Sequence, residues 1–427
     1  MLNSLINAMY RLIFYTLLCC ATVASQAQNY ADIIRNNPAM GATNMMCYHF
    51  DADEYTSAPK GYDAFYISHY GRHGSRYQSS DKYASSIWPI LRKADSLGIF
   101  TEAGEAFYND FNAYMTEQQG MYGMLTELGA QEQRGIAKRM ASNFPSVFKG
   151  RNNRTKVVCQ SSTVPRCIVS MTNFVHSLDR SEGGLDYMFC TGEKYFQRLA
   201  YFPKPSPSVA LAQTKNDSLR RATMKPDEII RHLFSDTQKA YEMINDPYIF
   251  EMELYYASCG GHLSNHGTCL LSYFPTEVLV RNWEAANARF YLAYGMSYEM
   301  AESQKEISRR LLSDFVDRAE LAVADGSDIA ADFRFGHDTS LLPLVGHIGI
   351  EGMDRWCSFD DVNQIWNSSV SICMGSNLQM VFYRNGSGDI LVKLLYNEKE
   401  TMIPALRAFC GPYYKWDDMK SYLESLL

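Results

Sequence analysis

Two arginines flank a histidine in the segment Gly71-Arg-His-Gly-Ser-Arg-Tyr77, directly after a short apolar run that is typical of a buried strand. Loops at the carboxyl ends of such strands commonly hold functional sites. Arginine forks match phosphate oxygens, and two nearby cations lower the pKa of a histidine. We therefore expect His73 to be a neutral nucleophile aimed at a phosphorus atom whose charge Arg72 and Arg76 neutralise. Gly74 lets the backbone turn tightly or approach a ligand closely. The alternative is a surface turn with solvated charges.

A second candidate segment, Phe335-Gly-His-Asp-Thr-Ser340, also follows a predicted strand. We expect His337 to donate hydrogen bonds to a phosphate oxygen and Asp338 to protonate a leaving alcohol. The alternative for Asp338 is a capping residue at the start of a helix. A third segment, Gln160-Ser-Ser-Thr-Val-Pro-Arg166, ends a strand in hydroxyls and an arginine, and taken alone it is more typical of an ordinary loop.

The composition restricts the class of protein. The chain has 427 residues, of which 46% are hydrophobic and 20% charged, values typical of a folded soluble protein. They exclude a disordered tail, a coiled coil, a collagen-like fibre and a protein with many membrane spans. The 40 Lys plus Arg against 47 Asp plus Glu give a formal net charge of -7. We therefore expect no nucleic-acid partner, and an anionic ligand must be held by a local cluster of arginines.

The first 27 residues have the pattern of an export signal. Arg11 supplies a positive charge, residues 12–23 are apolar but short for a membrane span, and Ser25-Gln26-Ala27 offers a cleavage site. We expect a periplasmic, surface-associated or secreted protein with no membrane span after cleavage. The alternatives are a buried N-terminal helix and a lipoprotein signal at Cys20.

Cysteine and histidine spacing gives no metal site. Removal of the signal leaves nine of the 11 cysteines, an odd number that can form disulfides in an oxidising compartment but whose pairing cannot be deduced. No CxxC pair is present, so structural zinc is not expected. His262 and His266 are four residues apart, as metal ligands on a helix are, but the neighbouring glycines favour a loop.

The predicted elements alternate between strands and helices. Strands are expected over 63–68, 156–160 and 329–335, a hairpin over 378–397, and helices over 131–144, 226–245, 276–294 and 300–324. This order predicts an α/β fold: a central, mostly parallel sheet flanked by helices, with an inserted or capping all-α domain. We place the α/β domain at 28–174 and 326–427 and the helical insert at 175–325.

Together the three segments resemble the histidine acid phosphatases, the branch of the histidine phosphatase superfamily that includes the phytases. In that family an Arg-His-Gly-x-Arg motif supplies the nucleophile, and a distal His-Asp supplies a phosphate ligand and the general acid. The resemblance implies these roles for Arg72, His73, Arg76, Arg166, His337 and Asp338. It also implies a phosphohistidine intermediate, with arginines in the place of a metal and no cofactor.

The chain is most similar to the multiple inositol polyphosphate phosphatases, including bacterial ones. The shared segments are 65–77, Pro165-Arg-Cys167 and 377–384. One departure is His337-Asp338-Thr339, where those enzymes usually carry His-Ala-Glu. The resemblance implies a phosphatase acting on a small phosphorylated molecule, either an inositol polyphosphate such as phytate or, alternatively, the broader substrates of an acid or sugar-phosphate phosphatase. An alternative from another class is a phosphate-binding protein without catalysis.

Overall fold

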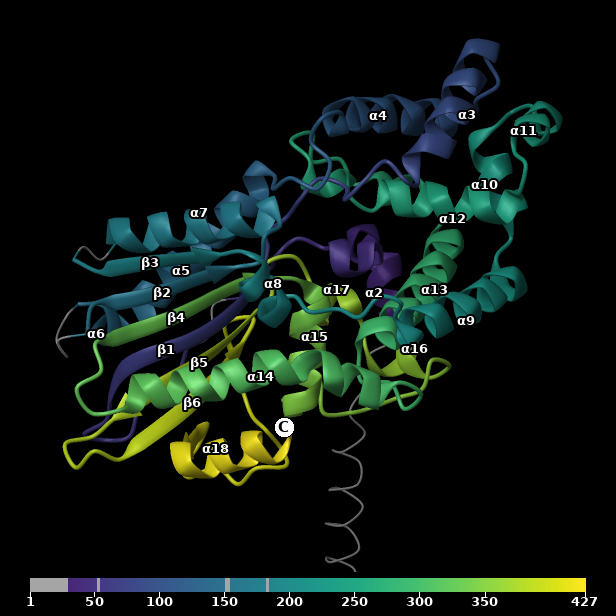
Figure 1. Ribbon diagram of the computed structural model, residues 1–427. Coiled ribbons are helices and arrows are strands. Elements are labelled where there is room, and N and C mark those ends of the chain that lie inside the picture. Colours follow the sequence, from purple (N-terminus) through teal and green to yellow (C-terminus); the bar gives the residue numbers. More distant parts are fainter. Residues whose placement is uncertain (1–29, 52–53, 150–153, 182–183) are drawn as a thin grey trace, which may run out of the picture.

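A mixed sheet of eight strands forms the centre of the protein (Figure 1), in the order β3-β2-β4-β1-β5-β6-β7, with β8 paired to β6. The computed structural model describes residues 30–51, 54–149, 154–181 and 184–427, so the predicted export signal over 1–27 lies outside the described residues. The strands are β1 (Asp63–Arg72), β2 (Lys156–Ser161), β3 (Asp186–Thr191), β4 (Ile329–Gly336), β5 (Asn377–Arg384), β6 (Ile390–Tyr396), β7 (Lys399–Thr401) and β8 (Tyr413–Lys415).

The strands β3, β2, β4 and β1 are parallel, and β5 to β8 add an antiparallel half. This sheet confirms the predicted α/β class. In the register, Arg72 of β1 lies opposite Gly336 of β4, and Ser161 of β2 lies opposite Phe335. Three strands therefore end side by side at one edge of the sheet.

Both faces of the sheet are covered because side chains alternate along the strands. On one face Ile67 and Phe333 pack against α5 (Glu127–Asn143) and α7 (Pro165–Ser181). On the other face Tyr66 and Phe382 belong to a core with α14 (Ala301–Val323), α15 (Asp338–Ile348) and α18 (Trp416–Ser425). Figure 1 shows these layers above and below the strands.

A second group of helices encloses its own hydrophobic core, with Phe107, Phe111, Leu254 and Trp283 buried at its centre. In Figure 1 this group stands beyond the end of the sheet. It is built from α3 (Ala84–Leu97), α4 (Glu102–Gln118), α10 (Pro226–Leu233), α11 (Thr237–Met243), α12 (Pro247–Ser258) and α13 (Thr276–Tyr294), with α9 (Pro207–Thr223) packed against α13. The shorter helices are α2 (Tyr30–Asn36), η1 (Pro38–Met45), α6 (Pro145–Phe148), α8 (Glu193–Leu199), η2 (Gly261–Leu263), η3 (Leu270–Tyr273), α16 (Val362–Ile365) and α17 (Ser368–Ser371).

Several element predictions need adjustment. The helix expected over 226–245 is divided into α10 and α11, because Asp236 begins a new helix by accepting a hydrogen bond from the backbone N–H of Lys239. The insert expected over 175–325 contains β3 of the sheet and α14, which packs on β1 and β4, whereas α3 and α4 join the helical group. The boundaries between sheet and helices therefore differ from the predicted ones. Within the described ranges, no helix combines the length and apolar character that crossing a membrane requires.

Candidate active site

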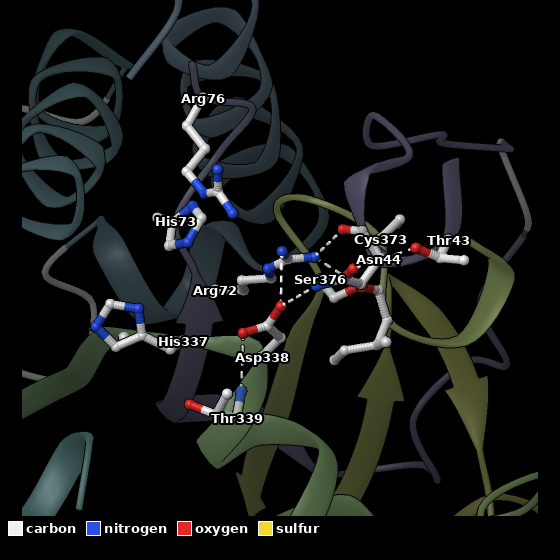
Figure 2. Close-up of polar contacts among 12 residues, drawn as sticks. Thr43, Asn44, Arg72, His73, Arg76, His337, Asp338, Thr339, Cys373 and Ser376 are labelled. Carbon is white, nitrogen blue, oxygen red and sulfur yellow. Dashed lines mark hydrogen bonds and ion pairs between the residues drawn. The ribbon is translucent and has the colours of Figure 1, made fainter. Parts of the chain in front are cut away.

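The predicted site residues converge at the edge where β2, β4 and β1 end. Arg72 is the last residue of β1 and His73 follows it, while His337 follows β4 and Asp338 begins α15. Arg166, which the loop-like segment after β2 left undecided, lies in the first turn of α7. Figure 2 shows the side chains of His73, His337 and Asp338 beside the guanidinium groups of Arg72 and Arg76. Residues separated by up to 266 positions thus form one cluster.

The ring of His73 is held in one tautomer. Its Nδ1 lies 2.9 Å from the carbonyl oxygen of Gly74, and because a carbonyl only accepts hydrogen bonds, Nδ1 carries the proton and Nε2 keeps its lone pair. The side chain is buried, and its ring meets that of His337 edge-on with 5.6 Å between centroids. Burial, followed by the charges of Arg166, Arg72 and Arg76, holds the pKa of His73 well below its ordinary value. His73 is therefore an uncharged imidazole with a free nucleophilic nitrogen.

Arg76 and Arg166 carry positive charge without a carboxylate partner in the described parts of the chain. Arg76 Nη1 donates to the carbonyl of Tyr77 at 2.9 Å, and Arg166 Nη1 lies 3.5 Å from the carbonyl of Gly123. The Nε atoms of both arginines are buried without a hydrogen-bond partner. Burial and the charges of Arg166 and Arg72 lower the pKa of Arg76 to about 9. Two crowded guanidinium groups with unsatisfied donors form a site for an anion.

Arg72 forms an ion pair with Asp338, with 2.8 Å between Nη2 and Oδ2. The other terminal nitrogen of Arg72 donates to the carbonyls of Asn44, at 2.6 Å, and Ile372, at 2.7 Å. Asn44 also donates from Nδ2 to Asp338 Oδ2 at 2.7 Å, and the backbone N–H of Thr339 donates to Oδ1 at 2.9 Å. Burial raises the pKa of Asp338, but Arg72 and Asn44 together outweigh it and the pKa is lowered. The carboxylate is thus ionised and fixed in place (Figure 2).

His337 is positioned through its backbone and its ring. The backbone N–H donates to the hydroxyl of Tyr70 at 3.0 Å, and the ring Nε2 lies 3.2 Å from Ser162 Oγ. Burial, followed by the charge of Arg166, lowers the pKa of His337 to about 3. It is therefore neutral and can donate one hydrogen bond to an anion.

The loop that carries His73 rests on α5, which the sequence did not indicate. Glu132 accepts hydrogen bonds from the backbone N–H and the hydroxyl of Ser75, at 2.6 and 2.7 Å. Gln133 Nε2 donates to the carbonyl of Arg72 at 3.1 Å. A side-chain Cβ on Gly74 would lie 2.3 Å from the carbonyl oxygen of Gly129, so this glycine allows a close approach of two backbones. Glu132 and Asn44 could not be predicted from the sequence, because each is far along the chain from its partner and only the fold brings the two together.

Three other histidines lie outside this cluster. His69 is buried against the rings of Phe174 and Phe333, at 5.3 and 5.8 Å between centroids, and supports β1 rather than the loop. His262 lies in η2 and is half-buried, and His266 is exposed. Among the described residues no group of three or more potential ligands is arranged to hold a metal ion.

Comparison with known proteins identifies the architecture. No family model and no curated protein sequence matches the chain. Among solved structures, the multiple inositol polyphosphate phosphatase of Bifidobacterium longum in complex with inositol hexasulfate superposes with a TM-score of 0.74 at 22% identity, over 90% of this chain and 97% of that one. This chain has the fold of that phosphatase. The phytase of D. castellii is similar, with a TM-score of 0.70 at 14% identity over 91% and 85% of the two chains.

A third solved structure, of lower similarity, also superposes on this chain. The Hafnia alvei phytase gives a TM-score of 0.52 at 12% identity, over 87% of this chain and 98% of that one. The resemblance drawn from the sequence motifs is thus confirmed at the level of the fold. The roles of the individual side chains rest on the geometry described above.

Proposed function

We propose that the protein is an exported histidine acid phosphatase that hydrolyses phosphomonoesters of inositol polyphosphates, such as phytate, through a phosphohistidine at His73. The fold shared with a multiple inositol polyphosphate phosphatase and with phytases supports this proposal. The observation that carries it is the fixed tautomer of His73: a lone pair on Nε2 beside three guanidinium groups. A nucleophile in such a field attacks a group that arrives with negative charge, as a phosphate ester does.

In the first step Nε2 of His73 forms a bond to phosphorus while the bond from phosphorus to the ester oxygen breaks. Arg72, Arg76, Arg166 and His337 hold the other phosphate oxygens, where charge must be stabilised in the transition state. The leaving alcohol takes a proton from Asp338. A phosphate that binds Arg72 competes with the carboxylate for this guanidinium, so it raises the pKa of Asp338 and makes that proton available.

In the second step water attacks phosphorus and the bond to Nε2 breaks. Asp338, now a carboxylate, takes the proton of the attacking water and is ready for the next cycle. Inorganic phosphate leaves with the oxygen of the water, and His73 returns to its neutral form. Side chains of the chain itself carry every proton and every charge in these steps, so the proposal requires no added group.

The decisive experiment measures release of inorganic phosphate from phytate and from a simple sugar phosphate, in the presence of a chelator, with the His73→Ala variant as the blank. We expect release by the natural protein, a preference for phytate and no turnover by folded His73→Ala protein, checked by circular dichroism. Full activity of that variant would refute the assignment. Binding without release by the natural protein would favour a phosphate-binding protein that lacks catalysis.

A second candidate is a broad acid or sugar-phosphate phosphatase with the same chemistry. The observation that favours it is Asp338-Thr339 in the place of the Ala-Glu usual in the inositol polyphosphate phosphatases. Preference for the sugar phosphate in the same experiment would select this candidate. Export through residues 1–27 is tested separately, by sequencing the N-terminus of the processed protein, which we expect to begin at Gln28.

A further inference from the structure

Three tyrosines and an arginine gather beside the candidate active site, on the helical group. We call Tyr83, Tyr256, Tyr294 and Arg289 the tyrosine cluster. The rings of Tyr83, just before α3, and Tyr256, on α12, stack with 4.8 Å between centroids and 23° between planes. The Nε2 of Gln78 donates to the carbonyl of Tyr256 at 3.1 Å. Because Gln78 follows Arg76 by two residues, this bond ties the tyrosine cluster to the loop that carries His73.

Tyr294 connects the tyrosine cluster to Asp338. It ends α13, which packs against α15, and its ring lies on Phe290 with 5.0 Å between centroids. Burial and the negative charge of Asp338 raise the pKa of Tyr294, whereas the positive charge of Arg289 lowers it. Tyr294 therefore lies within the electrostatic reach of the general acid and of Arg289 at once.

Arg289 forms no ion pair within the described ranges, although the negative charge of Asp217 acts on it. Its Nε donates to the amide oxygen of Gln213 at 3.2 Å. In contrast, Arg281 on the same helix forms an ion pair with Glu228. Arg220, only 4% exposed, lies over the ring of Tyr256 at 5.3 Å, and its Nη2 is buried without a hydrogen-bond partner. Arg289 is thus a guanidinium without an ion pair, whereas Arg220 is held by a hydrogen bond from its Nη1 to Asn282 Oδ1 at 2.9 Å.

The hydroxyls of the tyrosine cluster are suited to an anion. Burial raises the pKa of Tyr83 and of Tyr294, so both hydroxyls keep their protons at neutral and acidic pH. Neutral O–H groups next to a guanidinium donate to phosphate oxygens without adding negative charge. The stacked rings offer an apolar surface for the C–H face of a polyol ring.

We propose that the tyrosine cluster is a second anion subsite, which binds a phosphate of the substrate other than the one under attack. The proposal rests on the proposed function, and it narrows the substrate to a polyol carrying at least two phosphates. A phosphate held by Arg289 positions the ring so that another phosphate faces His73. A monophosphate carries no second phosphate for this subsite, so its affinity does not depend on the tyrosine cluster.

The test compares Arg289→Gln with Arg281→Gln, a matched control on the same helix. We expect the KM for inositol hexakisphosphate to rise about tenfold in Arg289→Gln, the loss of one charge-assisted contact, while kcat and KM for 4-nitrophenyl phosphate stay within about twofold. Arg281→Gln should leave the ratio between the two substrates unchanged. Equal losses on both substrates in Arg289→Gln, or no loss on either, would overturn the subsite.

A binding measurement separates this inference from the proposed function. Calorimetric titration with inositol hexasulfate, which the protein does not need to turn over, should show about tenfold weaker binding to Arg289→Gln than to the natural protein and to Arg281→Gln. Unchanged binding would contradict the subsite even if phosphatase activity is present. If the natural protein hydrolyses neither substrate, the proposed function fails, and weaker binding by Arg289→Gln alone would still support an anion subsite.

Discussion

At the scale of single residues, one guanidinium serves two partners. Arg72 is held by the carbonyls of Asn44 and Ile372 and forms an ion pair with Asp338, so its position does not depend on a ligand. In the proposed reaction, a phosphate at His73 needs the same positive charge. Because the proposed reaction requires a protonated Asp338 only while a phosphate is bound, the exchange of partners at Arg72 couples binding to the supply of the proton.

The Asp338→Asn variant tests this coupling. We expect at least a 100-fold loss of kcat on sugar phosphates, whose alkoxide leaves only with a proton, and a much smaller loss on 4-nitrophenyl phosphate. Steady-state kinetics on both substrates gives the comparison, and Asp317→Asn, on the exposed side of α14, is the control. Equal losses on the two substrates would exclude Asp338 as the general acid.

At the scale of elements, the loop after β1 depends on a contact between two backbones. The Cβ of an alanine at position 74 would lie 2.3 Å from the carbonyl oxygen of Gly129, in the first turn of α5, and no flexible side chain is there to move away. We expect Gly74→Ala to lower the free energy of unfolding by about 1–3 kcal/mol and to reduce kcat, because His73 moves with the loop.

Urea unfolding and phosphate release together measure this effect. The control is Gly386→Ala, in the turn between β5 and β6, where an added Cβ meets nothing within 4 Å. We expect its stability and activity to stay close to those of the natural protein. A Gly74→Ala variant with natural stability and natural kcat would show that the loop does not need this close approach.

The sequence predicted the elements whose signals are local. The strands β1, β2 and β4 are continuous buried runs, and the motif at His73 follows directly on the first of them. The strand β3 was missed because it is an edge strand with Met188 and Phe189 exposed, which gives neither a buried run nor a clear alternation. Asn44 was also missed, since its partner Asp338 is 294 positions away and only the fold brings them together.

At the scale of the whole molecule, the fold buries several histidines in neutral form. Burial lowers the pKa of His69 and of His337 to about 3, and that of His262 and of His347 to about 4. In the unfolded chain these rings take up protons near pH 6.5. As the pH falls below that value, the unfolded state binds protons that the folded state does not bind, so the free energy of unfolding decreases. The contribution of these histidines to stability is therefore greatest above pH 6.5 and falls towards pH 4.

Buried carboxyls such as Glu132 change the stability with the opposite pH dependence, because burial raises their pKa. Their contribution is the same in every variant, so replacement of one buried histidine isolates the contribution of that histidine. His69 suits this test, since it lies in the core among aromatic rings and takes no part in the proposed reaction. Between pH 6.5 and 5.5 the natural protein should lose on the order of 1 kcal/mol more than His69→Leu does. Urea midpoints at the two pH values measure the difference, with His176→Leu, at an exposed position, as the control for removal of a histidine. If His69→Leu loses as much stability as the natural protein, His69 accepts a proton in the folded state, and the core around β1 is more polar than its packing indicates.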